Sequence, residues 1–196
     1  MELHLGMLFG LLFMTMGPIR AVAVFAGVGT DDNAPGVRRL AARAAGLTAI
    51  AFVLAVFGGT GPLASWEVSL PMLIGSAGVV LLALSLQSLL VPAPQSTSQI
   101  DPLKLRPTTL VFPGLFPPIA VTIPIIFAAA VPNLRAQLEI IAVGLGVVLL
   151  NWLLMLRAKR IMRAIGPSPL EILGAVFGVL QAALAMQFIV NAAKML

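Results

Sequence analysis

The side chains that carry out most acid–base, metal and nucleophilic chemistry are scarce in this sequence. Cysteine is absent, and the single histidine, His4, lies at the N-terminus. These counts exclude a thiol nucleophile, a disulfide framework and a metal site built on several histidines. The sequence contains no P-loop, no dinucleotide fingerprint and no nucleophile–base pair, and its acidic residues are scattered. We therefore expect no enzyme, no metal site and no cofactor.

The chemistry that the sequence does offer is backbone chemistry, at prolines inside apolar stretches. Gly17-Pro18 interrupts the first such stretch, and Pro113-Gly114 and Pro117-Pro118 interrupt a later one. Proline lacks an amide donor and forces the preceding residue out of helical geometry, so each point predicts a broken helix. In hydrocarbon, freed backbone groups are tolerated only where they face protein or a water-filled cavity. The alternative is that these prolines only kink two helices for packing.

Polar side chains lie beside both breaks. Thr15 and Thr122 flank them, and Arg20 is the basic residue that lies well inside an apolar stretch. Arg20 is open to several roles: binding an anionic group of a solute, pairing with freed carbonyls or with a distant Glu, or extending to the membrane surface. The predicted substrate-binding residues are Thr15, Gly17, Pro18, Arg20, Gly114, Pro117, Pro118 and Thr122. The other interior polar residues are interpreted as interhelical hydrogen-bonding groups: Gln87, Asn151, Gln181 and Gln187.

The elements that must position these residues are membrane spans. Hydrophobic residues make up 60% of the 196-residue chain and charged residues 10%, against about 25% charged in soluble domains. This composition excludes a soluble enzyme, a disordered chain and a nucleic-acid-binding domain. A bilayer core of ~30 Å needs about 20 apolar residues in a helix. Six stretches approach that length: 5–28, 46–64, 68–91, 109–131, 138–156 and 171–192.

The distribution of Lys and Arg predicts an orientation. The connections after the first, third and fifth stretches carry nine of these residues: Arg38, Arg39, Arg43, Lys104, Arg106, Arg157, Lys159, Arg160 and Arg163. The other side carries two, Arg135 and Lys194. The positive-inside rule then places both termini outside the cytoplasm, in the periplasm of an inner-membrane protein. The N-terminus has no basic segment before its apolar stretch, so we expect a retained helix and no cleaved signal peptide.

The two halves of the chain look like copies of one unit. Pro18-Ile19 matches Pro118-Ile119 at an offset of 100, and the segments starting at Leu73 and Ile172 share four identities at an offset of 99. Three spans per half make this an inverted repeat: residues 1–91, a cytoplasmic linker over 92–108, and residues 109–196. The fold class expected is therefore an all-α membrane protein of six helices, with the first and fourth interrupted. Gly6-xxx-Gly10 and Gly174-xxx-Gly178 are expected to pack inside the bundle, with a homo-oligomer face as the alternative.

The pattern resembles the MarC family of bacterial inner-membrane proteins over nearly the whole chain. The segments that carry the resemblance are Met16–Ile19, Pro113–Ile119, Ile165–Ile172 and Ala185–Val190. The resemblance implies six spans with outside termini and transport of small neutral amino acids. The family's Asp-Pro-x-Gly-Asn is altered here, with Gly17 in place of the Asp and Arg20-Ala21 in place of Gly-Asn. The family's second motif, Gly-Pro-Gly, stands here as Pro117-Pro118-Ile119.

These substitutions remove a carboxylate and add a cation at the expected site. We hypothesise a transporter of a small solute, an amino acid or a small anionic metabolite, that works by alternating access at a midplane site. The alternative is a non-transporting membrane partner or assembly protein, which the altered motif favours. An intramembrane enzyme acting on lipid is the weakest alternative. The expected partners are the lipid bilayer and the solute, and no nucleic acid.

Overall fold

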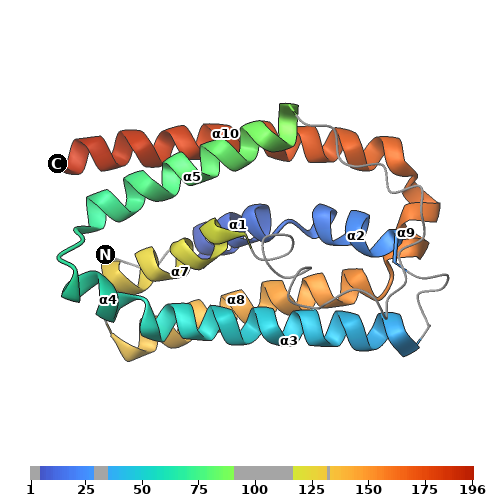
Figure 1. Ribbon diagram of the computed structural model, residues 1–196, viewed down its shortest axis with the longest axis horizontal. Coiled ribbons are helices and arrows are strands. Elements are labelled where there is room, and N and C mark those ends of the chain that lie inside the picture. Colours follow the sequence, from blue (N-terminus) through green and yellow to red (C-terminus); the bar gives the residue numbers. More distant parts are fainter. Residues whose placement is uncertain (1–4, 29–34, 91–116, 132) are drawn as a thin grey trace.

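A computed structural model describes residues 5–28, 35–90, 117–131 and 133–196, and every element in these ranges is helical (Figure 1). In chain order the helices are α1 (Leu5–Met16), α2 (Pro18–Ala26), α3 (Pro35–Gly58), α4 (Thr60–Ser65), α5 (Leu70–Leu90), α7 (Pro118–Ala130), α8 (Leu134–Met155), α9 (Ala158–Ile165) and α10 (Pro167–Met195). The all-α class is thus confirmed for the described chain. The expected linker over 92–108 lies outside the described residues.

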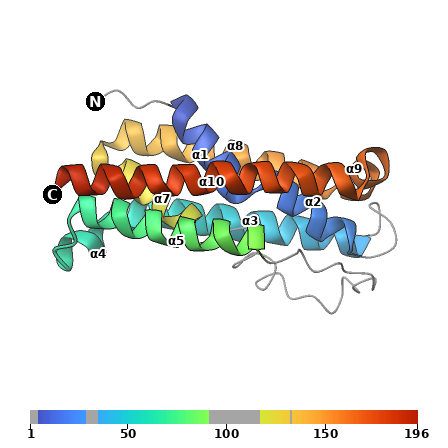
Figure 2. The same cartoon turned by 90° about the horizontal axis from the view of Figure 1, so that it is seen from above.

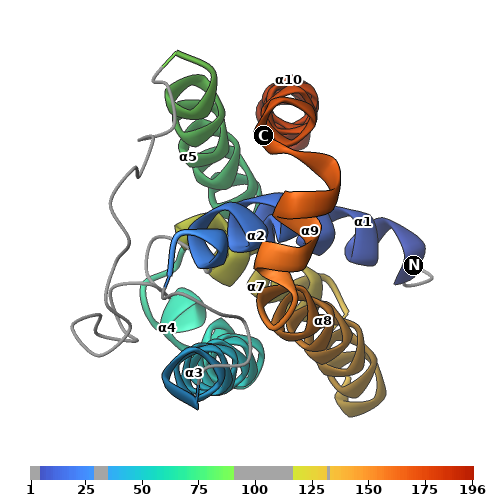
Figure 3. The same ribbon diagram turned by 90° about the vertical axis from the view of Figure 1, so that its right-hand side faces the viewer.

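The long helices lie side by side along one axis in three layers (Figure 3). The pair α5 and α10 forms one outer layer, and the pair α3 and α8 forms the other. Between them lie α1, α2 and α7. α9 crosses one end of the bundle, while α4 and the C-terminal end of α10 lie at the other (Figure 2). The Gly17-Pro18 break and the start of α7 at Pro118 therefore lie in the middle layer, where neighbouring helices can cover a freed backbone.

Five helical segments are long and apolar enough to cross a membrane: Leu5–Ala26, Pro35–Ser65, Leu70–Gln87, Leu134–Met155 and Ser168–Met195. A shorter apolar helix covers Ile119–Ala130. It falls in the fourth predicted span, 109–131, whose first residues lie outside the described ranges. The chain is therefore a multi-pass membrane protein by the length and composition of its helices.

The helices extend beyond several of the predicted stretches, and the difference is largest at α3 and α9. The third helical element, α3, begins at Pro35, whereas the apolar stretch begins at 46, so Arg38, Arg39 and Arg43 are helical. The connection predicted over 157–169 contains an eight-residue helix, α9. The reason is the same in both places. Hydropathy detects the part of a helix that contacts lipid, while a helix continues into water as long as its residues favour it. Proline at the first position of α3 is compatible with that early start.

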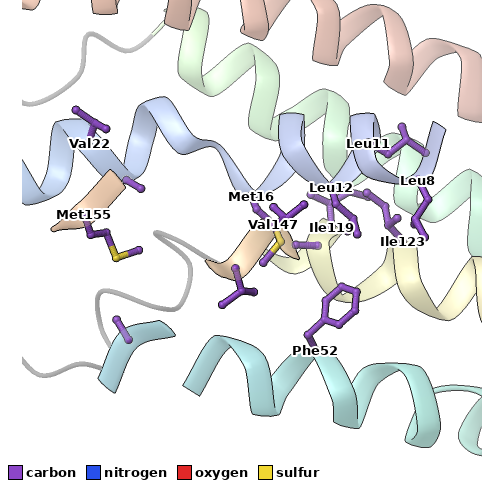
Figure 4. Packing of buried hydrophobic residues seen from close by; sticks show 14 of the residues in the cluster. Leu8, Leu11, Leu12, Met16, Val22, Phe52, Ile119, Ile123, Val147 and Met155 are labelled. Carbon is purple, nitrogen blue, oxygen red and sulfur yellow. The ribbon is translucent and has the colours of Figure 1, made fainter. Parts of the chain in front are cut away.

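The core joins the middle layer to the outer layers. Leu8, Leu12 and Met16 of α1 pack with Ile119 and Ile123 of α7 in one buried cluster (Figure 4). Outside this core the surface is strongly apolar: Ile172 is 65% exposed and Val179 is 59% exposed. A water-facing protein rarely exposes a continuous surface of this kind, whereas a membrane protein presents it to lipid.

Glycines permit the closest helix contacts, but at positions other than those predicted. A Cβ atom on Gly144 would collide with the ring of Phe52 across the α3–α8 contact. A Cβ on Gly78 would lie 2.8 Å from a side-chain carbon of Ile189 across the α5–α10 contact. A Cβ at Gly6, Gly10 or Gly174 would meet nothing within 4 Å. The expectation of packing inside the bundle is wrong for these three glycines, whereas Gly178, the fourth glycine of the two motifs, is buried. Spacing alone does not show which helix face turns inward.

Candidate functional site

The first predicted break is present and lies at Gly17. α1 ends at Met16, α2 begins at Pro18, and Gly17 between them has a left-handed backbone with φ 53° and ψ 79°. Pro18 occupies the first position of α2, where a backbone N–H would have no hydrogen-bond acceptor within α2, so α2 loses nothing by its absence. Glycine adopts positive φ without the steric penalty that a Cβ brings. The Gly-Pro pair therefore interrupts the helix inside an apolar segment that is otherwise long enough to span the bilayer.

Gly17 takes part in two backbone hydrogen bonds, one to each of the helices that flank it. The Gly17 N–H donates to the carbonyl of Phe13 at 3.3 Å, and the Ala21 N–H donates to the carbonyl of Gly17 at 3.0 Å. In an unbroken helix the carbonyl of Met14 would accept from residue 18, which is proline. That carbonyl accepts instead from the side-chain amide Nε2 of Gln181 on α10. A side chain from another layer thus replaces the missing backbone donor.

The contact between α10 and the end of α1 has a second component. Phe177 lies one turn before Gln181 on α10, and its ring meets the ring of Phe13 edge-on, with centroids 6.2 Å apart. Phe13 and Met14 are consecutive, so one face of α10 holds both residues. The general prediction of an interhelical hydrogen bond is confirmed for Gln181. Its link to the break was missed, although the missing proline N–H shows that a donor is needed.

The remaining polar residues of the spans behave differently. Gln187 donates to Asn191 within α10 at 2.7 Å, so the interhelical prediction is wrong for that bond. Gln87 is exposed on α5. The Oδ1 atom of Asn151 and the Nε1 atom of Trp152 are buried and have no hydrogen-bond partner among the described residues. The sequence also predicts an interhelical hydrogen bond for Asn151, and its Oδ1 atom makes none among the described residues.

Asn151 lies at the level of the break. It is 5% exposed and shares one face of α8 with Val147 and Met155, which are one turn before and one turn after it. Figure 4 shows Val147 near Met16 and Met155 near Val22, in agreement with the contacts of α8 with α1 and α2. A buried carbonyl oxygen without a donor costs about 1–3 kcal/mol. Asn151 is therefore a polar group that this region of the core leaves unsatisfied.

Thr15 is buried, with 4% of its surface exposed. Its hydroxyl donates within α1, to the carbonyl of Leu11 at 2.8 Å and to that of Leu12 at 3.3 Å. The single hydroxyl proton is shared between these two acceptors, so Thr15 retains only the acceptor capacity of its oxygen. The placement beside the break is as predicted, but the hydroxyl proton is used locally.

The second predicted break is described from Pro117 onwards. Pro117 is extended, with φ −66° and ψ 160°, and α7 begins at Pro118. The Ala120 N–H donates to the carbonyl of Pro117 at 2.9 Å. Thr122 lies in the second turn of α7 and is half-buried. Gly114 lies outside the described residues, as does any helix that precedes Pro117.

The Gly17 break and the start of α7 lie close together in the bundle. Met16, one residue before Gly17, and Ile119, one residue after Pro118, belong to the same buried cluster (Figure 4). Both α2 and α7 begin near the middle of the long axis and run toward opposite ends (Figure 1). Each of these half-helices starts with a proline. Two helix N-termini, which carry partial positive charge, therefore lie near the centre of the molecule.

A cavity of about 280 Å³ lies away from the breaks, at the end of the bundle that contains α4. Its polar lining side chains are Thr60 and Gln137. The apolar part of its lining is Leu63, Ala64, Val68, Leu70, Leu73, Ala128 and Ala129. Ala128 and Ala129 come from the last turn of α7, so the cavity reaches the half-helix that begins at the second break.

The sequence comparison decides the family. Residues 3–196 match the family described as MarC family integral membrane protein. The chain belongs to the MarC family. No curated protein and no solved structure matches it. The match covers the segments around Gly17 and Pro117-Pro118, so this MarC protein has the Gly17 break and the start of α7 within the family's own region. Membership also agrees with the long apolar helices in making the chain an integral membrane protein.

Proposed function

We propose that this MarC family protein transports a small solute by alternating access, and that the solute binds near the bilayer midplane between the Gly17 break and the start of α7. The observation that carries the proposal is the convergence of two half-helix N-termini, those of α2 and α7, near the middle of the bundle (Figure 1). Interrupted helices that end at the midplane form the solute sites of many secondary transporters.

The solute class follows from the charge at this place. Helix N-termini favour anionic groups, and Arg20 lies two residues after Pro18. The unpaired Oδ1 of Asn151, at the same level, would accept a hydrogen bond from an ammonium or hydroxyl group. An amino acid or a small anionic metabolite has groups that match this set. Thr15, Gly17, Pro18, Arg20, Gly114, Pro117, Pro118 and Thr122 remain the proposed contact residues, with Asn151 added.

The architecture proposed for transport is an inverted repeat of six spans. Corresponding helices of the two halves pack against each other, α3 with α8 and α5 with α10. Within each pair the helices run in opposite directions (Figure 1). This is the arrangement expected of two units related by an axis in the membrane plane, and it would allow one repeat to move against the other.

The proposed orientation follows from the basic residues. Arg38, Arg39 and α9 lie at one end of the bundle, which would face the cytoplasm, and the C-terminus lies at the other (Figure 1). Trp66, 76% exposed between α4 and α5, would lie at the outer interface, where tryptophan is enriched. The protein would then be located in an inner membrane with both termini in the periplasm.

Uptake into proteoliposomes tests the transport proposal. We expect the intact protein to move labelled amino acids or organic acids, and Arg20→Ala to lower uptake at least tenfold. Arg135→Gln, an exposed site on α8, is the matched control and should keep full activity. If small neutral amino acids, organic acids and phosphorylated compounds neither move nor bind, the transport proposal is wrong.

The second candidate function is that of a non-transporting membrane partner. One observation favours it: the carbonyl freed by Pro18 is bonded by Gln181, as expected for a break covered by protein. Cysteine accessibility separates the two functions, because the chain has no native cysteine. Thr15→Cys and Thr122→Cys should react with small aqueous thiol reagents if they line a solute path. Ala185→Cys, fully buried on α10, is the protected control, and protection of all three would favour the partner function.

A further inference from the structure

The short helix α9 carries three arginines at one end of the bundle. Arg157 occupies the N-cap position of α9, and Arg160 and Arg163 follow at intervals of three residues, so the three arginines lie on one side of the helix. All three are exposed. Side chains at this spacing are about 5–6 Å apart at their Cβ atoms. The result is a dense row of positive charge on one helix face.

The opposite face of α9 is apolar and covered by protein. Ala158 is buried, and Ile161 and Met162 are half-buried in contact with the core. Their partner is α2, the second half of the broken first span. Because protein covers the apolar face, the arginine face is the side of α9 that points away from the bundle.

The place of α9 in the fold sets its depth in the membrane. It joins the end of α8 to the start of α10, two helices long enough to span, and it crosses the end of the bundle (Figure 3). Gly166 makes the turn into α10 with φ 81°. A segment between two spans lies at the level of the lipid headgroups, where the arginines of α9 can reach phosphate.

Basic residues close to α9 add to the positive charge at this end of the bundle. Arg38, Arg39 and Arg43 are exposed in the first turns of α3, which begins at the same end (Figure 2). Lys159 adds a further basic side chain on α9. Among the described residues, the acidic side chain nearest in sequence to α9 is Glu171 on α10, which is exposed. A helix dipole disfavours cations in its first turn, so Lys159 and Arg160 do not gain stability from the helix itself.

We propose that α9 binds the phosphate groups of anionic phospholipids, with Arg157, Arg160 and Arg163 as the contact residues. Arginine forms paired hydrogen bonds with phosphate oxygens, and basic segments at the membrane surface are attracted to anionic lipid. The apolar face on α2 keeps the row oriented toward the headgroups. Bound lipid would hold α9, and through it α2, at this end of the bundle.

The test compares the protein in nanodiscs of phosphatidylcholine with and without phosphatidylglycerol, by thermal unfolding and by native mass spectrometry of retained lipid. We expect phosphatidylglycerol to raise the unfolding temperature and to remain bound. The triple variant Arg157→Gln, Arg160→Gln, Arg163→Gln should weaken retention by roughly tenfold or more. The double variant Arg135→Gln, Lys194→Gln, at the opposite end, should behave as the unmodified protein.

Three outcomes would overturn the proposal. One is equal stability and retention in both lipids, and another is an equal loss in the double variant. The third is an identical shift produced by inorganic phosphate in phosphatidylcholine alone, since that would indicate a site for a soluble anion. If the triple variant does not fold, Arg157→Lys, Arg160→Lys, Arg163→Lys replaces it. This variant keeps the charge and should retain the lipid preference, and high salt should reduce that preference in the unmodified protein.

Discussion

At the scale of single residues, a hydrogen bond from Gln181 decides how the break is tolerated. Pro18 has no N–H, so the carbonyl of Met14 loses its helical donor, and the Gln181 amide supplies another. Without that donor a backbone oxygen would be buried in an apolar layer, at a cost of about 1–3 kcal/mol. The break is therefore stabilised by a residue that lies 167 positions away in the chain.

Removal of that donor should destabilise the protein. We expect Gln181→Leu to lower the free energy of unfolding by about 1–2 kcal/mol, because the Met14 carbonyl loses its partner. Unfolding in mixed detergent micelles measures the change. Gln187→Leu is the control on the same helix, since that exposed side chain bonds only to Asn191 among the described residues. Equal effects of the two substitutions would contradict the role given to Gln181.

The left-handed backbone of Gly17 makes a second prediction at this scale. Gly17→Ala places a Cβ at φ 53° and should cost roughly 1–2 kcal/mol. Gly10→Ala in the same span is the control, because a Cβ there meets nothing within 4 Å and the helical backbone accepts alanine. The same unfolding assay compares the two. A neutral Gly17→Ala would mean that residues 13–21 form an ordinary helix.

At the scale of helices, the contact between α3 and α8 depends on one missing side chain. Gly144 lies against the ring of Phe52, which is fully buried, so the two helices approach closely at this point. The pair α3–α8 supports the middle layer from one side, and α5–α10 supports it from the other (Figure 3). Close contacts of this kind replace the hydrophobic effect as the source of helix association in lipid.

An added methyl group should therefore have different effects on stability at two nearby glycines of α8, Gly144 and Gly146. We expect Gly144→Ala to destabilise the protein by about 1–3 kcal/mol, because the new methyl group overlaps the Phe52 ring. Gly146→Ala should be neutral or stabilising, because a Cβ there meets open space. Thermal unfolding in detergent measures both. The double variant Gly144→Ala, Phe52→Leu should recover part of the loss, and no recovery would argue against this contact as the cause.

At the scale of the whole molecule, the apolar surface and the charged residues bear on two different properties, the depth of the protein in the bilayer and its direction across it. The exposed apolar side chains of α5 and α10 suit lipid around the bundle, while six arginines lie at one end of it: Arg38, Arg39, Arg43, Arg157, Arg160 and Arg163. The apolar surface suits a position inside the bilayer, and the positive-inside rule applied to these arginines gives the orientation proposed above.

This orientation predicts the sidedness of labelling. Ala164→Cys on α9 and Ser65→Cys at the end of α4 are exposed at opposite ends of the bundle. In intact cells a membrane-impermeant maleimide should label Ser65→Cys, and it should label Ala164→Cys only after permeabilisation. The absence of native cysteine removes background labelling. The reverse pattern would place the termini in the cytoplasm.

The sequence by itself determined the class of the protein, the place of the first break and the identity of its family. Apolar stretches of sufficient length predict spans, and Gly17-Pro18 predicts a broken helix from local sterics that no tertiary contact needs to supply. The full length of α3 and the existence of α9 were missed, because hydropathy marks contact with lipid rather than the ends of a helix.

Only the tertiary structure decided which groups meet. The side chain of Gln181 bonds to the Met14 carbonyl, the ring of Phe52 packs against Gly144, and the Oδ1 atom of Asn151 has no donor among the described residues. In the sequence, Gln181, Gly144 and Asn151 all have apolar neighbours, so their local surroundings do not distinguish these outcomes. The physical reason is that each helix in a membrane is apolar on every side. The sequence period that reveals the inner face of a soluble helix is therefore weak here, and the packing of the layers selects the contacts.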